Sequence, residues 1–235
     1  MTSEKNNYSE HPKFHVALDC IIFGFDKGEL KLLIHKRRFE PAKGHWSLFG
    51  GFMKEDESLE EAANRILQEL TGLEKIYMEE LQTYGAIERD PAGRVISVAY
   101  YALIPAHKYS EAYSNQYGAT WVSIKDLPPL IMDHDVMVEK GLTRLQWRAS
   151  TQPIGFRLLP REFTIPQLQS LYEAIYQSKL DKRNFRKKII SMDVLIKLEE
   201  KDKIHSRKGA FLYRFDKRKY EKLGDGGYNF TISRV

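Results

Sequence analysis

The chain has 235 residues, of which 42% are hydrophobic and 12% aromatic, enough for the core of one large domain or two small ones, and this composition excludes a fully disordered chain. The net charge of +5 is unevenly distributed: residues 161–235 contain 18 Lys and Arg against 10 Asp and Glu, whereas residues 1–160 contain 19 against 22. The last third of the chain is therefore basic, which is typical either of a polyanion-binding module or of a lysine-rich solvated surface.

The cysteine count and the hydropathy pattern limit the cellular setting. The single cysteine, Cys20, excludes an internal disulfide framework and a cysteine-based zinc site. The polar N-terminus lacks the apolar run of a signal peptide, and no stretch approaches the roughly 18 apolar residues of a membrane span. We therefore expect a soluble cytoplasmic protein with no membrane partner.

The first 150 or so residues alternate between strand and helix patterns. Apolar and β-branched runs separated by Gly, Asp and Pro turns predict strands over residues 14–25, 31–38, 82–88, 94–105 and 119–124. Residues 134–150 have the pattern of a helix. A further helix pattern follows Ser58, and strands on both sides of it predict an α+β or α/β sandwich.

Residues 51–73, GFMKEDESLEEAANRILQELTGL, contain the strongest local signal. Ser58 and Glu61 form a capping-box pattern, and Gly72 follows the last apolar residue of the helical face. Gly50 and Gly51 allow a tight turn that brings backbone close to a ligand. We predict a helix whose N-terminus follows a glycine turn.

This segment resembles the Nudix box, in which seven of nine fixed positions match: Gly51, Glu57, Arg65, Leu67, Glu69, Gly72 and Leu73. The preceding GHWSLFGG is similar to the family's run into the box, with Phe49 where proline is usual. The resemblance implies a Nudix-type α/β/α sandwich. It also implies that Glu57 and Arg65 tie the loop to the helix.

The two mismatches fall on the positions that hold metal. In Nudix hydrolases, carboxylates at i, i+3 and i+4 of the helix bind the Mg²⁺ that bridges a diphosphate. Here those positions are Ile66, Glu69 and Leu70, so one carboxylate of three remains. We therefore predict no bound metal, no cofactor, no catalytic residue and no enzymatic activity. Glu69 is either a leftover acid or a group that hydrogen-bonds a ligand.

A retained scaffold without its metal ligands favours a sensor that binds an effector. Seven residues are predicted to line the effector pocket: Asp19, Arg37, Trp46, Glu69, Glu88, Arg89 and His134. Of these, Arg37, Glu88, Arg89 and His134 lie beside predicted strand ends or loops, where Nudix pockets are lined. Asp19 interrupts an apolar strand, so it is either a pocket acid or an acid paired at a strand end. Trp46 either stacks on the ligand or packs beside the glycine pair.

Residues 163–192 have the pattern of a helix-turn-helix. Thr164 is a predicted N-cap with Pro166 in the first turn, and Asp181 is the predicted cap of a second helix. Phe185, Ile189 and Ile190 are predicted to face inward. The polar residues of this helix are predicted to face outward: Lys182, Arg183, Asn184, Arg186, Lys187 and Lys188. The alternative is an ordinary helix pair with a solvated basic face.

Residues 194–215 have the pattern of two strands around a charged turn, as in the wing of a winged helix, with Arg207 and Lys208 at its tip. In a helix-turn-helix protein the second helix enters the DNA major groove. Arg183 and Asn184 are predicted to contact bases, because Arg suits guanine and Asn suits adenine. Lys187 and Lys188 are predicted to contact phosphates.

A degenerate Nudix domain over residues 1–155 followed by a winged helix-turn-helix over residues 156–235 resembles the Nudix-related transcriptional regulators. The resemblance implies a homodimeric repressor that binds a double-stranded DNA operator and a small effector. One branch senses ADP-ribose and another controls sugar catabolism. Loss of two metal carboxylates favours the sugar branch, so we expect an arabinose-responsive regulator of carbohydrate metabolism with L-arabinose as effector. An ADP-ribose sensor and a divergent Nudix pyrophosphohydrolase are the alternatives.

Overall fold

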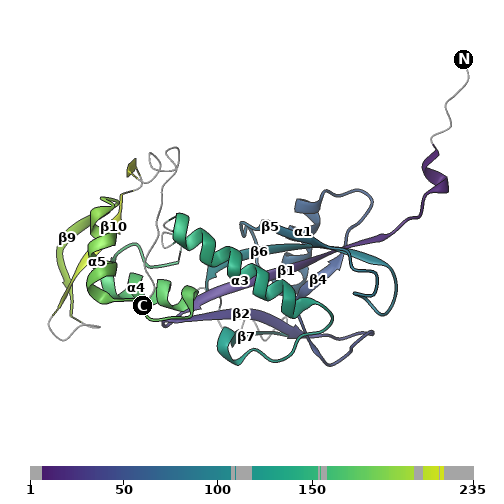
Figure 1. The fold of residues 1–235 in the computed structure, drawn as a ribbon, viewed down its shortest axis with the longest axis horizontal. Coiled ribbons are helices and arrows are strands. Elements are labelled where there is room, and N and C mark those ends of the chain that lie inside the picture. Colours follow the sequence, from purple (N-terminus) through teal and green to yellow (C-terminus); the bar gives the residue numbers. More distant parts are fainter. Residues whose placement is uncertain are drawn as a thin grey trace, which may run out of the picture.

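The computed structural model describes residues 7–106, 109, 118–152, 154, 158–203, 209–216 and 218–219. Its elements form an elongated molecule with a large sheet-and-helix part at one end and a smaller part at the other (Figure 1). The large part ends with helix α3 (His134–Thr151), and the small part begins at Phe163. This arrangement confirms the predicted α/β/α sandwich followed by a winged helix.

One mixed sheet organises the large part. Its strands are β1 (His15–Asp26), β2 (Glu29–Lys36), β3 (Trp46–Ser47), β4 (Phe49–Phe52), β5 (Glu79–Tyr84), β6 (Val95–Pro105) and β7 (Ala119–Ser123). The central strand β1 pairs antiparallel with β2 and β4 and parallel with β6. Strand β5 extends the sheet beyond β6, while β3 and β7 both pair with β2.

Helices cover both faces of this sheet. Alternate residues of β1 point to opposite sides, so that Ile21 and Phe23 pack with α3 while Cys20 and Ile22 pack with α1 (Leu59–Thr71). Gly141 of α3 allows the helix to approach closely, because a Cβ there would lie 3.3 Å from Ile21 Cδ1. Short 3-10 helices at Asn7–Glu10 and Ile124–Asp126 complete this part.

The predicted caps of α1 are confirmed. The backbone N–H of Glu61 donates to Ser58 Oγ at 3.2 Å, and the backbone N–H of Ser58 donates to Glu61 Oε2 at 2.8 Å. Gly72 ends the helix with φ of 69°, in the left-handed region that glycine occupies at little cost. The helix therefore begins and ends where the sequence places it.

The small part is a helix pair with a three-stranded sheet. Its elements are β8 (Phe163–Thr164), α4 (Ile165–Tyr176), α5 (Lys182–Ser191), β9 (Leu195–Asp202) and β10 (Ala210–Phe215). The strand order is β8-β10-β9, with β10 antiparallel to both neighbours. Thr164 and Asp181 cap α4 and α5 as predicted, accepting from the backbone N–H of Gln167 at 3.3 Å and of Asn184 at 2.8 Å.

Two local predictions are wrong. Ile190 is 45% exposed instead of inward-facing. At about 100° per residue it lies about 140° around the helix from Phe185, outside the stripe that Phe185 and Ile189 bury. The strand predicted over residues 82–88 is shifted, since β5 begins at Glu79 and ends at Tyr84. The strand begins with charged residues, which are unusual in strands, and its start is instead set by the pairing of Glu79 with Tyr101 of β6.

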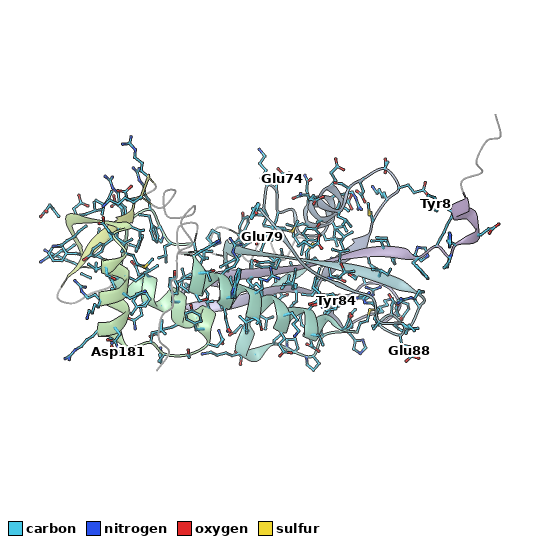
Figure 2. All side chains as sticks on the ribbon, turned by 45° about the horizontal axis from the view of Figure 1, so that its top comes forward. Tyr8, Glu74, Glu79, Tyr84, Glu88 and Asp181 are labelled. Carbon is cyan, nitrogen blue, oxygen red and sulfur yellow. The ribbon has the colours of Figure 1, made fainter. Side chains whose placement is uncertain are left out.

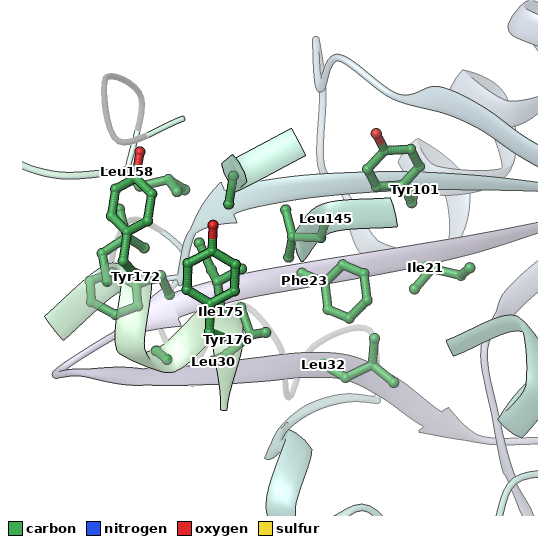
Figure 3. Close-up of a cluster of buried hydrophobic side chains, with 14 of the residues drawn as sticks. Ile21, Phe23, Leu30, Leu32, Tyr101, Leu145, Leu158, Tyr172, Ile175 and Tyr176 are labelled. Carbon is green, nitrogen blue, oxygen red and sulfur yellow. The ribbon is translucent and has the colours of Figure 1, made fainter. Parts of the chain in front are cut away.

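The two parts share one hydrophobic core. Figure 3 shows Phe23 and Leu30 of the sheet beside Leu145 of α3 and Ile175 and Tyr176 of α4. The side-chain amide of Gln146 in α3 also donates to the carbonyl of Ile175 at 3.1 Å. We call this set the shared core. It packs the winged helix directly against the sheet and α3.

Candidate effector pocket and nucleic-acid interface

A cavity opens at the end of the sheet remote from α4, beside the N-terminus of α3. Four of the predicted effector residues line it: Asp19, Arg37, Arg89 and His134. They come from β1, the segment after β2, the segment between β5 and β6, and the start of α3. Gly50 of β4 completes the wall next to Asp19, because a Cβ there would lie 2.3 Å from Asp19 Oδ1.

Asp19 is buried and surrounded by donors. The hydroxyl of Ser97 donates to Asp19 Oδ2 at 2.5 Å, and Arg89 Nη2 lies 3.6 Å from the same oxygen. His134 Nε2 lies 3.5 Å from Oδ1. A buried carboxylate is tolerated only when it is paired and hydrogen-bonded. Both alternatives for Asp19 therefore apply, because it lines the cavity and is also a paired acid.

Arg89 connects this acid to α3. Its Nε and Nη2 atoms donate to the two carboxylate oxygens of Asp133, at 2.9 and 2.7 Å. Asp133 is the residue before the first turn of α3. The arginine side chain is only 3% exposed and Asp133 is 22% exposed, so the two side chains form a part-buried, bidentate, charge-assisted pair. It fixes the cavity wall to the start of α3.

His134 and His35 are held by backbone groups of Leu48. The backbone N–H of Leu48 lies 3.1 Å from His134 Nδ1, which makes Nδ1 an acceptor and assigns the proton to Nε2, facing Asp19. His35 Nε2 lies 3.2 Å from the Leu48 carbonyl. Burial is the main factor that lowers the pKa of His35, opposed by this hydrogen bond, and the charge of Arg37 lowers it further. His35 is therefore a neutral donor at neutral pH.

Arg37 is half-buried and incompletely paired. Its Nε atom is buried and has no hydrogen-bond partner within the part of the chain that the structure describes. The guanidinium carbon lies 4.3 Å from the centroid of the Phe39 ring, a cation–π contact that orients the side chain. The cavity therefore contains one arginine with an unused donor.

The Nudix-box scaffold is intact. Arg65 donates from Nε to Glu57 Oε2 at 2.8 Å and from Nη2 to Glu57 Oε1 at 2.5 Å, and Nη2 also donates to the carbonyl of Phe52 at 3.0 Å. The hydrogen bonds from Arg65 lower the pKa of Glu57 to about 2. The loop before α1 is thus tied to the helix as the sequence predicts.

The former metal face has lost its ligands. Ile66 is 2% exposed and packs beneath Gly51, where an added Cβ would lie 3.1 Å from its Cγ1. Leu70 lines the cavity, and Glu69 points to solvent, 3.3 Å from Arg65 Nη1. Across the described ranges, no group of three or more His, Cys, Asp or Glu side chains is placed to hold a metal ion. These residues do not fit Mg²⁺, which needs oxygen ligands.

Helix α5 presents a basic face away from the core. Its buried side is fixed by Phe185, whose ring meets Tyr172 of α4 edge-on at 5.6 Å. The turn before it is tied down, because Glu173 Oε1 accepts from the backbone N–H of Leu180 at 3.1 Å. The predicted outward residues are exposed, with Lys188 half-buried: Lys182, Arg183, Asn184, Arg186, Lys187 and Lys188.

Strands β9 and β10 form the antiparallel pair of the wing. The predicted tip residues Arg207 and Lys208 lie outside the described residues. On the described part of the hairpin, Lys197 and Lys201 place their ammonium groups 3.8 and 4.5 Å from the centroid of the Phe211 ring. This basic surface was not predicted from sequence, although two lysines an even number of residues apart on one strand place their side chains on the same face.

Family models match both parts of the chain: the NUDIX domain over residues 13–140 and the NrtR DNA-binding winged helix domain over residues 155–215. The chain is also 31% identical over 217 residues to the ADPR responsive transcriptional repressor NtrR of Acinetobacter baylyi, covering 91% of this chain and 86% of that protein. The chain belongs to the NrtR family of Nudix proteins.

Solved NrtR structures have the same architecture. Shewanella oneidensis NrtR complexed with a 27mer DNA matches with a TM-score of 0.76 and 28% identity, covering 94% of this chain and 99% of that one. The Nudix domain of the same protein complexed with ADP ribose matches with a TM-score of 0.52 and 29% identity, covering 62% of this chain and 99% of that one. The predicted arabinose-responsive regulator finds no support here, whereas the alternative, an ADP-ribose sensor, does.

Three residues predicted for the effector site lie outside the cavity of this NrtR-family chain. Trp46 packs against the core, with Lys36 Nζ 5.2 Å from the centroid of its ring. Glu69 is 56% exposed, and Glu88 lies exposed at the outer end of the domain (Figure 2). Conversely, His35, Ser47 and Leu48 line the cavity and were not predicted. No described helix of this NrtR-family chain has the length and apolarity to cross a membrane.

Proposed function

We propose that this chain is a DNA-binding transcriptional repressor whose Nudix domain binds ADP-ribose and whose winged helix binds an operator. Helix α3 is the observation that carries the proposal, because one continuous helix contacts the cavity at one end and helix α4 of the winged helix at the other. At its N-terminus, Asp133 binds Arg89 and His134 faces Asp19. Toward its C-terminus, Leu145 joins the shared core and Gln146 binds the backbone of α4.

The distance between the two sites makes such a connection necessary. Glu88, the neighbour of Arg89, and Asp181, the cap of α5, lie toward opposite ends of the molecule (Figure 2). A ligand that displaces Arg89 or His134 changes the support at the start of α3, and the shared core passes a shift of α3 to α4. The coupling is a free energy between two sites, so operator DNA must in turn change the affinity for ADP-ribose.

The relatives support the same ligand and partner. One is named as ADPR responsive, another was crystallised with DNA, and its Nudix domain was crystallised with ADP ribose. The basic, exposed face of α5 suits a duplex, with Arg183 and Asn184 assigned to bases and Lys187 and Lys188 to phosphates. Homodimerisation remains part of the proposal, since a symmetric dimer would read a pseudo-palindromic operator.

The deciding experiment is a fluorescence anisotropy titration of the full chain against a duplex from the promoter nearest its own gene, at about 150 mM salt. We expect ADP-ribose to weaken DNA binding by roughly 5- to 150-fold, the usual range of allosteric coupling. L-Arabinose should have no effect. If the anisotropy did not rise with protein even when the titration was repeated at low salt, the proposal would be contradicted. Release of the DNA by arabinose alone would restore the sugar hypothesis.

The hydrolase alternative is tested separately. We expect no Mg²⁺-dependent release of AMP from ADP-ribose. The double variant Ile66→Glu with Leu70→Glu should also remain inactive, because Ile66 is packed under Gly51 and a carboxylate there would be buried. Turnover by the unmodified chain would identify an enzyme. Turnover by the variant alone would show that only these two substitutions separate the scaffold from an active hydrolase.

A further inference from the structure

We infer that the effector's diphosphate is bound without a divalent cation and that Arg37 supplies the charge that contacts it. This inference rests on the proposed function, because it concerns how the same cavity takes the same ligand. It assigns to one arginine the charge compensation that Mg²⁺ provides in catalytic Nudix sites. It also names the chemical class that the cavity selects, an anionic diphosphate over a neutral sugar.

Among the described residues that line the cavity, no three His, Cys, Asp or Glu side chains are placed to hold a metal ion. At the two positions where carboxylates are absent, Leu70 presents a hydrocarbon surface to the cavity and Ile66 is buried beneath Gly51. Glu69, the one carboxylate left at the three metal positions, is not among the cavity-lining residues and pairs with Arg65 on the solvent side. A hard cation would meet carbon at the positions of Ile66 and Leu70, so we expect side-chain donors to compensate the negative charge of the ligand.

The charge of Arg89 is already compensated by carboxylates of the protein. Its Nε and Nη2 atoms are both occupied by Asp133, and Nη2 also lies 3.6 Å from Asp19. Two carboxylates therefore surround one guanidinium in a region that is nearly closed to solvent. A phosphate placed directly against this group would also meet Asp19 and Asp133, which repel it.

His134 and His35 add no free positive charge to the cavity. His134 directs its Nε2 proton to Asp19, and His35 donates to the carbonyl of Leu48. Both rings are therefore already engaged with groups of the protein. They shape the cavity and orient its polar atoms, and Arg37 is the remaining cationic side chain that lines it.

Arg37 has the properties that an anion site requires. Its Nε atom is buried and unpaired within the described ranges, and no ion pair there involves its guanidinium. Phe39 holds the guanidinium at 4.3 Å, which limits its motion before a ligand arrives. A planar guanidinium matches two phosphate oxygens at once, whereas a lysine ammonium acts as a point charge. A neutral sugar would leave the positive charge of Arg37 without a counter-charge.

The test is calorimetric titration of ADP-ribose into the full-length chain, once with excess EDTA and once with millimolar MgCl₂. We expect the same affinity in both buffers. Arg37→Gln should weaken ADP-ribose binding by roughly 10- to 100-fold, the scale of a charge-assisted hydrogen bond in a cavity. Arg37→Lys should recover only part of this loss, because it restores charge without the planar fork.

Arg38→Gln is the matched control. Arg38 adjoins Arg37 in sequence, carries the same charge and is exposed outside the cavity lining, so its removal should leave ADP-ribose affinity unchanged. Operator binding without effector should be the same for the Arg37→Gln chain and for the unmodified chain, which shows that the fold is intact.

The failures are distinguishable. Loss of ADP-ribose binding in EDTA, or unchanged binding by Arg37→Gln, overturns this inference while leaving the proposed function standing. Equal losses in Arg37→Gln and Arg38→Gln also overturn it, since they indicate long-range attraction and not a contact. Absence of ADP-ribose binding in both buffers overturns the proposed function itself.

Discussion

The cavity and the outer face of α5 use charge in opposite ways. At the cavity, Arg89 pairs with both Asp19 and Asp133, and the side chains of Arg89 and Asp19 are almost closed to solvent. On α5 the cationic side chains project into solvent, and none of them forms an ion pair with another described residue. A small-ligand site has to be rigid before the ligand arrives, while a DNA-binding face gains affinity by keeping its cations free to displace counterions.

This difference predicts that charge removal affects folding at one site and DNA affinity at the other. Arg89→Met leaves Asp19 and Asp133 without their shared partner. We expect a loss of about 3 to 5 kcal/mol in the free energy of unfolding, the usual effect of breaking a buried pair, measured by urea denaturation. Arg186→Met is the control on α5 and should change stability by less than about 0.5 kcal/mol. Equal stability of both variants would contradict the structural role of the buried network.

Removal of a side chain that we predict to contact bases should affect operator recognition alone. Arg183→Ala is expected to weaken operator binding by about 1 to 3 kcal/mol, or roughly 5- to 150-fold. Its melting temperature should stay close to that of the unmodified chain. The loss should be smaller on a scrambled duplex of equal length, because only base contacts carry sequence information. An equal loss on both duplexes would reassign Arg183 to phosphate.

Removal of a side chain that we predict to contact phosphates should have a smaller, sequence-independent effect. We expect Lys187→Ala to weaken binding to operator and scrambled duplexes alike and to lower the slope of log affinity against log salt by about 1. Lys125→Ala, which changes an exposed lysine at Ile124–Asp126 in the Nudix domain, is the control and should leave the slope unchanged. An unchanged slope for Lys187→Ala would remove this residue from the interface.

We expect the smallest effect from the Glu57–Arg65 pair of the Nudix box, as a dependence of the melting temperature on pH. The pKa of Glu57 falls from an ordinary 4.5 to about 2 in the folded chain because Arg65 binds its charged form. Its stabilising contribution is therefore complete above about pH 4.5 and is lost as the pH falls toward 2. The difference in melting temperature between the unmodified chain and Glu57→Gln should shrink over this window. Glu55→Gln, an exposed neighbour, should show no such dependence.

The features that sequence predicted correctly depend on neighbours along the chain. The caps at Ser58 and Thr164 follow from residues three positions apart, and the Glu57–Arg65 pair follows from a motif of fixed spacing. Strand β5 was misplaced because its pairing with β6 overrides its own polar start. Local physics was therefore sufficient for helix ends and insufficient for strand limits.

The cavity required contacts that no local pattern encodes. Asp19 meets Ser97 and His134 across more than 70 residues of chain, and Asp133 gave no signal of its partner Arg89. The expectation of arabinose came from the missing metal carboxylates. Loss of a metal site does not by itself exclude a diphosphate ligand, because an arginine can also bind phosphate oxygens.

The shared core makes it difficult to separate the winged helix from the Nudix domain. Leu168, Leu171 and Ile175 of α4 are almost fully buried, and part of their cover comes from β2 and α3. A winged helix cut from the chain just after α3 would expose this surface to water and would be prone to aggregate. A chimeric biosensor built from this protein would therefore need α3 and its strand contacts carried along with the DNA-reading module.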